Sequence, residues 1–237
     1  MSFTEAEHYD RVWAEVDLDA ALYNMERMHQ NLKPGTKMAA VIKTDGYGHG
    51  ALRIAEKLEP LDYLWGYAVA TYEEACELRD GGMKKPILIL GYVFPYCYEG
   101  LAKKEIRPAC FREDMLEELS LAAEKAGKRI KVHIAVDTAM ARIGIRPDDS
   151  GLSFVKKALE TEGIEVEGIF THFSKADETA PENTFRQIRE FTEFCGRIEK
   201  ELGYRVPVQH CSNSAGLIRF PEANLDMVRA GITLYGL

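Results

Sequence analysis

Lys43 is the residue of this chain whose position most suggests covalent chemistry. It ends the apolar run 40–42 and precedes the glycine-rich stretch 44–50, in which Tyr47 supplies a hydroxyl donor. Glycine lets backbone amides approach a ligand closely, and a helix that begins near His49 would direct its positive end toward the same place. An isolated lysine at the end of a strand is usually a surface residue. In this context we instead predict an anion site beside a reactive amine.

Further polar residues follow apolar, β-rich runs, as Lys43 does. They are residues 137–142, His172, residues 210–214 and residues 229–232. In a (β/α)8 barrel the active site forms at the C-terminal ends of the strands, so these residues would lie near Lys43. Such barrels commonly bind phosphate after the last two strands. The backbone N–H groups of Gly231 and Ile232 and the hydroxyl of Ser214 are the candidates for that role.

Eight short β-rich runs alternate with amphipathic stretches and would position these residues. The predicted strands are residues 37–43, 65–69, 86–90, 106–110, 130–136, 164–170, 206–210 and 224–229. The alternation is typical of a parallel sheet covered by helices, and the count of eight predicts an α/β fold, a (β/α)8 TIM barrel. The clearest helix covers residues 182–202. Thr71 and Glu74 predict a capping box, and Gly81 and Gly127 are expected to end helices in the left-handed conformation.

One further segment lies outside this count. Residues 11–18 alternate apolar and polar side chains, which predicts a strand. Because it precedes the first barrel helix, we expect it to pair with something outside the barrel.

Length and composition allow one domain over residues 1–237, with 46% hydrophobic residues. The net charge of −8 and the lack of a basic run argue against a nucleic-acid partner. Five scattered cysteines without a Cys-x-x-Cys pair predict neither disulfides nor a metal site, and favour the cytoplasm. An acidic N terminus and the lack of a long apolar run predict a soluble protein with no membrane partner.

Taken together, these motifs resemble the alanine racemase family, whose members are pyridoxal 5'-phosphate (PLP) enzymes of fold type III. The resemblance covers the whole chain and is carried by Trp13-Ala-Glu-Val-Asp-Leu18, residues 40–50, Asp137-Thr-Ala-Met-Ala-Arg-Ile-Gly144, Thr171-His-Phe173, Asn213-Ser214 and Val228-Arg-Ala-Gly-Ile-Thr-Leu-Tyr-Gly-Leu237. It implies the N-terminal TIM-barrel domain of an enzyme that interconverts L-alanine and D-alanine, with PLP as cofactor. D-Alanine of this origin would serve peptidoglycan precursors.

The same resemblance implies a role for each candidate residue. Lys43 would carry PLP covalently and act as one of two bases. The residues that would bind the phosphate are Tyr47, Ser214, Gly231 and Ile232. His172 would lie against the cofactor ring, Arg229 would face its pyridine nitrogen and Arg142 would approach its phenolic oxygen. The residues that would line or support the site are Asn213 and His210. His133, inside a predicted strand, is expected to be a core residue.

The chain departs from the family pattern in two places. Family members often have a carbamate-bearing lysine where this chain has Ala135, so we expect a bound anion or another carboxylate to balance Arg142. The chain stops at Leu237, where members continue into a β-rich domain that supplies the second base across a dimer interface. We therefore expect a piece of a longer, homodimeric racemase with impaired activity, and assign the strand 11–18 to the absent domain's sheet.

Two alternatives stay open. A racemase for serine or for several amino acids would share these motifs, because much of the substrate pocket comes from the absent domain. A non-catalytic PLP-binding barrel would also have about this length. The segments 47–50 and 234–237 argue against the second alternative, because such barrels lack them.

Overall fold

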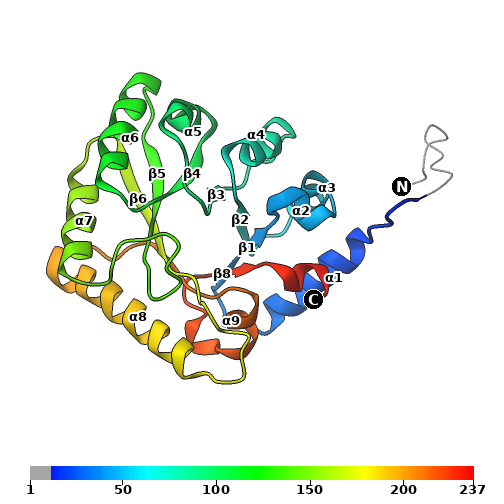
Figure 1. The fold of residues 1–237 in the computed structure, drawn as a ribbon. Helices are drawn as coiled ribbons and strands as arrows, with labels where there is room; N and C mark the ends of the chain where they lie inside the picture. Colours follow the sequence, from blue (N-terminus) through cyan, green and yellow to red (C-terminus); the bar gives the residue numbers. More distant parts are fainter. Residues whose placement is uncertain (1–11) are drawn as a thin grey trace.

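The computed structural model describes residues 12–237. Eight parallel strands form one sheet in the order β7-β6-β5-β4-β3-β2-β1-β8 (Figure 1). The strands are β1 (Lys37–Val41), β2 (Leu64–Val69), β3 (Ile87–Ile89), β4 (Ile106–Cys110), β5 (Ile130–Ala135), β6 (Ile164–Phe170), β7 (Val208–His210) and β8 (Met227–Ala230). The predicted strands overlap all eight, which confirms the TIM-barrel fold.

The barrel is nearly closed between its first and last strands in the sheet order, β7 and β8. These two strands form no hydrogen-bonded ladder, but two backbone hydrogen bonds join them. The amide of Asp226 donates to the carbonyl of Gln209 at 3.1 Å, and the amide of Arg229 donates to the carbonyl of Ser212 at 3.1 Å. The carboxyl ends of the eight strands therefore open at one face of the molecule.

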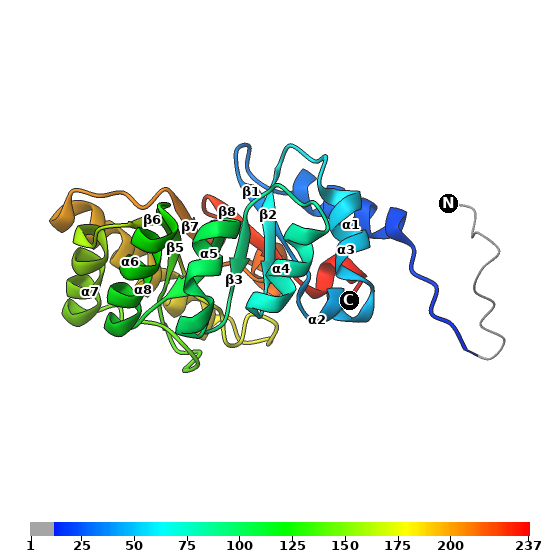
Figure 2. The ribbon, with the colours of Figure 1, turned by 90° about the horizontal axis from the view of Figure 1, so that it is seen from above.

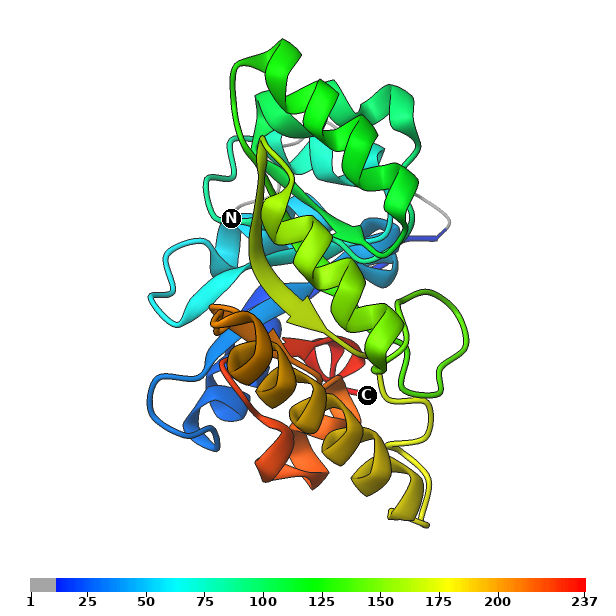
Figure 3. The ribbon, with the colours of Figure 1, turned by 90° about the vertical axis from the view of Figure 1, so that its left-hand side faces the viewer.

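Helices cover the outside of the sheet, and the apolar core fills the space between the two layers. They are α1 (Leu18–Gln30), α3 (Ala51–Leu58), α4 (Tyr72–Asp80), α5 (Tyr98–Lys104), α6 (Glu113–Ala126), α7 (Asp149–Glu160), α8 (Glu182–Leu202) and α9 (Ser214–Arg219), with short 3-10 turns at Pro95–Cys97, Pro221–Ala223 and Ile232–Tyr235 (η3). Figure 3 shows α6, α7 and α8, in green to orange, as part of this outer layer. The side chain of Asn24 in α1 donates to the carbonyl of Leu234 at 3.2 Å, which places α1 beside the end of the chain.

The strand expected at residues 11–18 is not formed. Residue 11 lies outside the described residues, residues 12–17 have no regular secondary structure, and Leu18 already begins α1 behind the N-cap Asp17. Figure 2 shows this segment leading away from the barrel, and Val12 is 81% exposed. The backbone groups of a strand need a hydrogen-bonded neighbour, and no described residue pairs with this segment. Pairing with a sheet outside the barrel stays a prediction.

The helix-end predictions were right in part. The capping box of Thr71 and Glu74 opens α4, and Gly127 ends α6 with a φ of 62°. Gly81, however, ends α4 with a φ of −73°, and Gly82 takes the positive φ of 94° in its place. The chain therefore reverses one residue later than predicted.

Candidate active site

A cavity of about 470 Å³ opens at the carboxyl ends of the strands. All the residues predicted to bind a cofactor line it: Lys43, Tyr47, Arg142, His172, Asn213, Ser214, Arg229, Gly231 and Ile232. His210 lies deeper and is fully buried. The strand ends thus bring together residues that are up to 189 positions apart in the sequence.

Lys43 begins a left-handed turn, α2 (Lys43–Gly48), rather than ending β1. Three residues of this turn that are not glycine have positive φ angles: Thr44 at 55°, Asp45 at 51° and Tyr47 at 54°. Each such residue costs about 1–2 kcal/mol relative to the right-handed conformation. The helix expected near His49 begins only at Ala51. The Lys43 amine is therefore carried next to strained backbone, a feature often found at functional sites.

The hydroxyl of Ser214 is the point on which several donors converge. It accepts hydrogen bonds from the backbone N–H of Gly231 at 3.0 Å and from the hydroxyl and the N–H of Thr233 at 3.0 and 3.4 Å. A methyl group built on Gly231 would lie 3.3 Å from this hydroxyl and 3.7 Å from that of Tyr47. Loop β8–η3 thus presents a set of donors that suits the oxygens of a phosphate group.

Arg229 is the charged side chain at the floor of the cavity and is 2% exposed. Its guanidinium donates to the carbonyls of Thr171 (2.7 Å), Cys211 (3.2 Å) and His210 (3.2 Å), and to Nδ1 of His210 at 2.7 Å. Asp226 is bound to Arg205 instead. Burial lowers the pKa of Arg229 to about 10, so it stays protonated at neutral pH. Among the described residues, its Nε–H has no partner and is free for a ligand.

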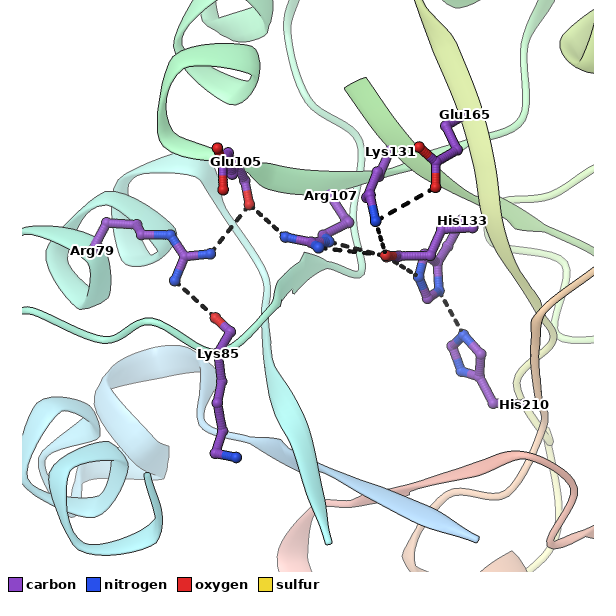
Figure 4. Close-up of polar contacts among 9 residues, drawn as sticks. Arg79, Lys85, Glu105, Arg107, Lys131, His133, Glu165 and His210 are labelled. Carbon is purple, nitrogen blue, oxygen red and sulfur yellow. Dashed lines mark hydrogen bonds and ion pairs between the residues drawn. The ribbon is translucent and has the colours of Figure 1, made fainter. Parts of the chain in front are cut away.

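A chain of hydrogen bonds runs from Arg229 through the inside of the barrel. Nδ1 of His210 accepts from Arg229, so its Nε2–H must donate to Nδ1 of His133 at 2.9 Å. The Nε2–H of His133 then donates to Glu167 at 3.3 Å, and Glu167 also accepts from Arg107 at 3.0 Å. Figure 4 shows the part of this chain from His210 to Arg107. Both histidines are therefore neutral, each in one tautomer.

The pKa shifts of these hydrogen-bonded residues agree with two neutral histidines. Burial, together with the charges of Arg107 and Arg229, lowers the pKa of His133, although Glu167 opposes the shift. Burial and the charge of Arg229 hold the pKa of His210 well below its ordinary value. Burial opposes ionisation of Glu167, but hydrogen bonds from His133 and Arg107 outweigh it and hold the pKa of this carboxyl low. His133 is a core residue, as predicted, but it is also a link to Arg229.

His172 lies among three cations. Burial, and then the charges of Arg229, Arg142 and Lys43, lower its pKa to about 3, so the imidazole is neutral at physiological pH. Asp177 is the only acidic side chain among the residues that line the described cavity. The cavity is therefore suited to an anion such as a phosphorylated cofactor or a carboxylate substrate.

Two predicted residues have features that the sequence did not indicate. Arg142 lines the cavity but is exposed and makes no ion pair with the described residues. Water can solvate such a guanidinium, so the partly dry site that led us to expect a balancing anion is not present in this chain.

Asn213 is the N-cap of α9, and its side-chain oxygen accepts from the amide of Gly216 at 2.9 Å. Its position is therefore also explained by helix capping.

Several residues of the cavity were missed from the sequence. They are Val41, Ala70, Leu90, Gly91, Met140, Phe170, Phe173, Ser174, Asp177 and Ala215. Most are small or apolar, and only their places after strands could have indicated them. Within residues 12–237, no group of three side chains could hold a metal ion, and no helix is both long and apolar enough to cross a membrane.

Comparison with known proteins identifies the family. A model described as "Alanine racemase, N-terminal domain" matches residues 16–237. The chain belongs to the alanine racemase family. Alanine racemase 1 of Oceanobacillus iheyensis is 41% identical over 97% of this chain and 60% of the relative, and an alanine racemase of Clostridium perfringens is 43% identical over 95% of this chain and 58% of the relative.

Solved alanine racemases share the fold closely. That of Clostridium difficile 630 has a TM-score of 0.93 at 34% identity, over 97% of this chain and 59% of the other. A Bacillus anthracis alanine racemase solved with bound L-Ala-P has a TM-score of 0.90 at 33% identity, over 98% of this chain and 59% of the other. This chain spans about three fifths of the length of the curated relatives it matches.

Proposed function

We propose that this chain is the PLP-binding barrel domain, residues 1–237, of a racemase that interconverts L-alanine and D-alanine. The single observation that carries the proposal is the cavity that joins Lys43 to the donors around Ser214 and to the buried cation Arg229. A primary amine, a phosphate-sized set of donors and a donor for a ring nitrogen are the groups that PLP requires. The family to which the chain belongs supports the same cofactor.

The proposed roles follow from the chemistry of the side chains. When bound, PLP withdraws electrons from the α-carbon of an attached amino acid. Lys43 would attach the cofactor, and its amine, once displaced by the amine of the substrate, would take or return the proton at the α-carbon. The donors Tyr47, Ser214, Gly231 and Ile232 would hold the phosphate. Asn213 would support this loop from the N-terminus of α9.

Arg229 and His172 would set the environment of the ring. Arginine can donate a hydrogen bond but does not practically give up its proton, so Arg229 would bind an unprotonated ring nitrogen. His172, neutral because its pKa is about 3, would pack against the ring without adding another positive charge. Arg142 would approach the phenolic oxygen and the substrate carboxylate.

Covalent attachment of PLP tests the proposal directly. The chain would be mixed with PLP, reduced with borohydride and digested, and the modified peptide identified by mass spectrometry. We expect the adduct on Lys43 and none on the Lys43→Ala variant. Lys37→Ala is the matched control, because Lys37 lies at the opposite end of β1 and donates to the carbonyl of Asp62. An adduct at another lysine, or none on folded protein, would refute the proposal.

Substrate preference needs a separate measurement on the full-length protein. Formation of D-alanine from L-alanine, compared with formation of D-serine from L-serine, distinguishes an alanine racemase from a serine or broad-specificity enzyme. We also propose a homodimer for the full-length protein and a location in the cytoplasm, where the five free cysteines would stay reduced. Attachment of PLP without racemisation of any amino acid would favour the non-catalytic alternative.

A further inference from the structure

Few hydrogen bonds tie the backbone around Lys43 to distant parts of the protein. Inside the left-handed turn α2, the amide of Gly46 donates to the carbonyl of Ile42 at 2.9 Å, and Asp45 accepts from the amides of Ala51 and Gly50. These bonds link α2 only to its own neighbours in sequence. A left-handed turn of residues that are not glycine persists only where the surroundings hold it.

One hydrogen bond ties the turn to another part of the protein. Among the described residues, the bond from the amide of Thr44 to Oε1 of Glu74, at 2.7 Å, is the only one from α2 to a residue distant in sequence. Behind the turn lies a cavity of about 430 Å³, lined by Asp45, Ala51 and Glu74 among others. The hydrogen bond therefore joins the turn to Glu74 at the edge of this cavity.

The two carboxylate oxygens of Glu74 bind two different segments, the turn α2 and the start of α4. While Oε1 accepts from Thr44, Oε2 accepts from the amides of Ala70 at 2.7 Å and Thr71 at 3.3 Å. The amide of Glu74 in turn donates to the hydroxyl of Thr71 at 3.3 Å, which completes the capping box of α4. An ionised carboxylate can accept on both sides, whereas an amide has only one accepting oxygen.

We propose that Glu74 is a positioning residue for Lys43. Its carboxylate locks the left-handed turn to the junction of β2 and α4 and so fixes the direction in which the Lys43 amine enters the cavity. This inference rests on the proposed function of Lys43 as the attachment point of PLP. A capping-box glutamate would otherwise be read as a helix-stabilising residue only.

Glu74→Gln tests the inference because its side chain keeps its size but can accept on one side only. The rate of PLP attachment to Lys43, measured by absorbance and by borohydride trapping, should fall about tenfold or more, as expected for loss of one hydrogen bond to a charged acceptor. A role in placement lowers the rate at every pH and leaves the shape of the pH profile unchanged. Hydrogen exchange of the Thr44 amide, followed by NMR, should accelerate by a similar factor without any PLP present.

Two further variants separate placement from general stability. Thr71→Ala removes one half of the capping box but leaves both carboxylate oxygens of Glu74 in place, so it should keep the wild-type attachment rate. Thr44→Gly relieves the strain at a φ of 55°, because glycine adopts that angle freely. In the double variant Thr44→Gly/Glu74→Gln, the attachment rate should return to the wild-type value. The same return is expected if Glu74→Gln alone is poorly folded.

The outcomes are distinct. A wild-type rate and unchanged Thr44 exchange in Glu74→Gln would overturn the inference, as would an equal loss in Thr71→Ala or a failure of Thr44→Gly to restore attachment. If the wild-type chain itself did not attach PLP, the proposed function would fail. The exchange of the Thr44 amide would then still decide whether Glu74 holds the turn.

Discussion

Acid should unfold this protein through three neutral histidines, of which His133 and His210 are fully buried and His172 is half-buried. His133, His172 and His210 all have a lowered pKa in the folded chain, with burial as the largest cause. In the unfolded chain each returns to an ordinary pKa near 6.5. Between that value and the folded pKa, which is about 3 for His172, the unfolded chain binds more protons. Stability is therefore fully present above pH 6.5 and is lost as the pH falls through this window.

The size of the effect follows from proton linkage. A histidine that stays neutral in the folded state and titrates near 6.5 in the unfolded state removes about 2.3 kcal/mol from the free energy of unfolding between pH 6.5 and 4.5. His172, whose folded pKa is about 3, contributes this loss, and the lowered pKa values of His133 and His210 add to it in the same direction. Glu167 also has a lowered pKa, and its protonation reduces the free energy of unfolding only below about pH 4.5. The loss between pH 6.5 and 4.5 therefore comes mainly from the histidines.

Urea unfolding of the chain without PLP, at constant ionic strength and at several pH values from 7.5 to 4.5, measures this loss. Little change is expected between pH 7.5 and 6.5. His172→Asn removes one titrating group at the edge of the core, so its loss between pH 6.5 and 4.5 should be smaller by about 2.3 kcal/mol. An equal loss in the variant, or a wild-type loss below about 2 kcal/mol, would show that these histidines are not held neutral.

Four further predictions follow. Ser214→Ala should raise the dissociation constant of PLP by about tenfold or more, measured by titration, because one phosphate contact is lost; an unchanged constant would remove Ser214 from the site. Glu167→Gln should lower the free energy of unfolding by about 3 kcal/mol or less, because it weakens a half-buried pair with Arg107; an unchanged urea midpoint would contradict this. Because this chain spans about three fifths of its relatives' length, we expect it to racemise L-alanine about 10² to 10⁴ times more slowly than a full-length relative, whereas equal rates would show that these residues suffice. Crystals of this chain soaked in bromide should show no ordered ion beside Arg142, because that side chain is exposed; strong anomalous signal there would restore the anion hypothesis.

Local sequence patterns determined the order of elements and the location of the site. Eight apolar runs separated by amphipathic stretches specify alternating strands and helices, since each pattern depends only on neighbouring residues. In a barrel of parallel strands all carboxyl ends open on one face, so Lys43, His172, Ser214 and Arg229 could be brought together before any distance was known. The cavity at that face contains all of them.

Tertiary structure decided which groups are paired and which segments form strands. Residues 12–17 show the alternation of a strand but have no partner in the described chain, so the pattern was not sufficient. The place of His133 inside a predicted strand indicated a core residue, but not that it would lie between His210 and Glu167.

In the turn that carries Lys43, too, the sequence determined one part of the arrangement and the tertiary structure another. Its glycines indicated unusual backbone, yet the positive φ angles of Thr44, Asp45 and Tyr47 run against the preference of each residue. They are held partly by Glu74, which is 30 positions away from Thr44 in the sequence. The sequence by itself determined where Lys43 lies relative to the strands, because that follows from local patterns. Its direction was decided only by the folded structure, because hydrogen bonds between distant segments exist only once the strands have assembled.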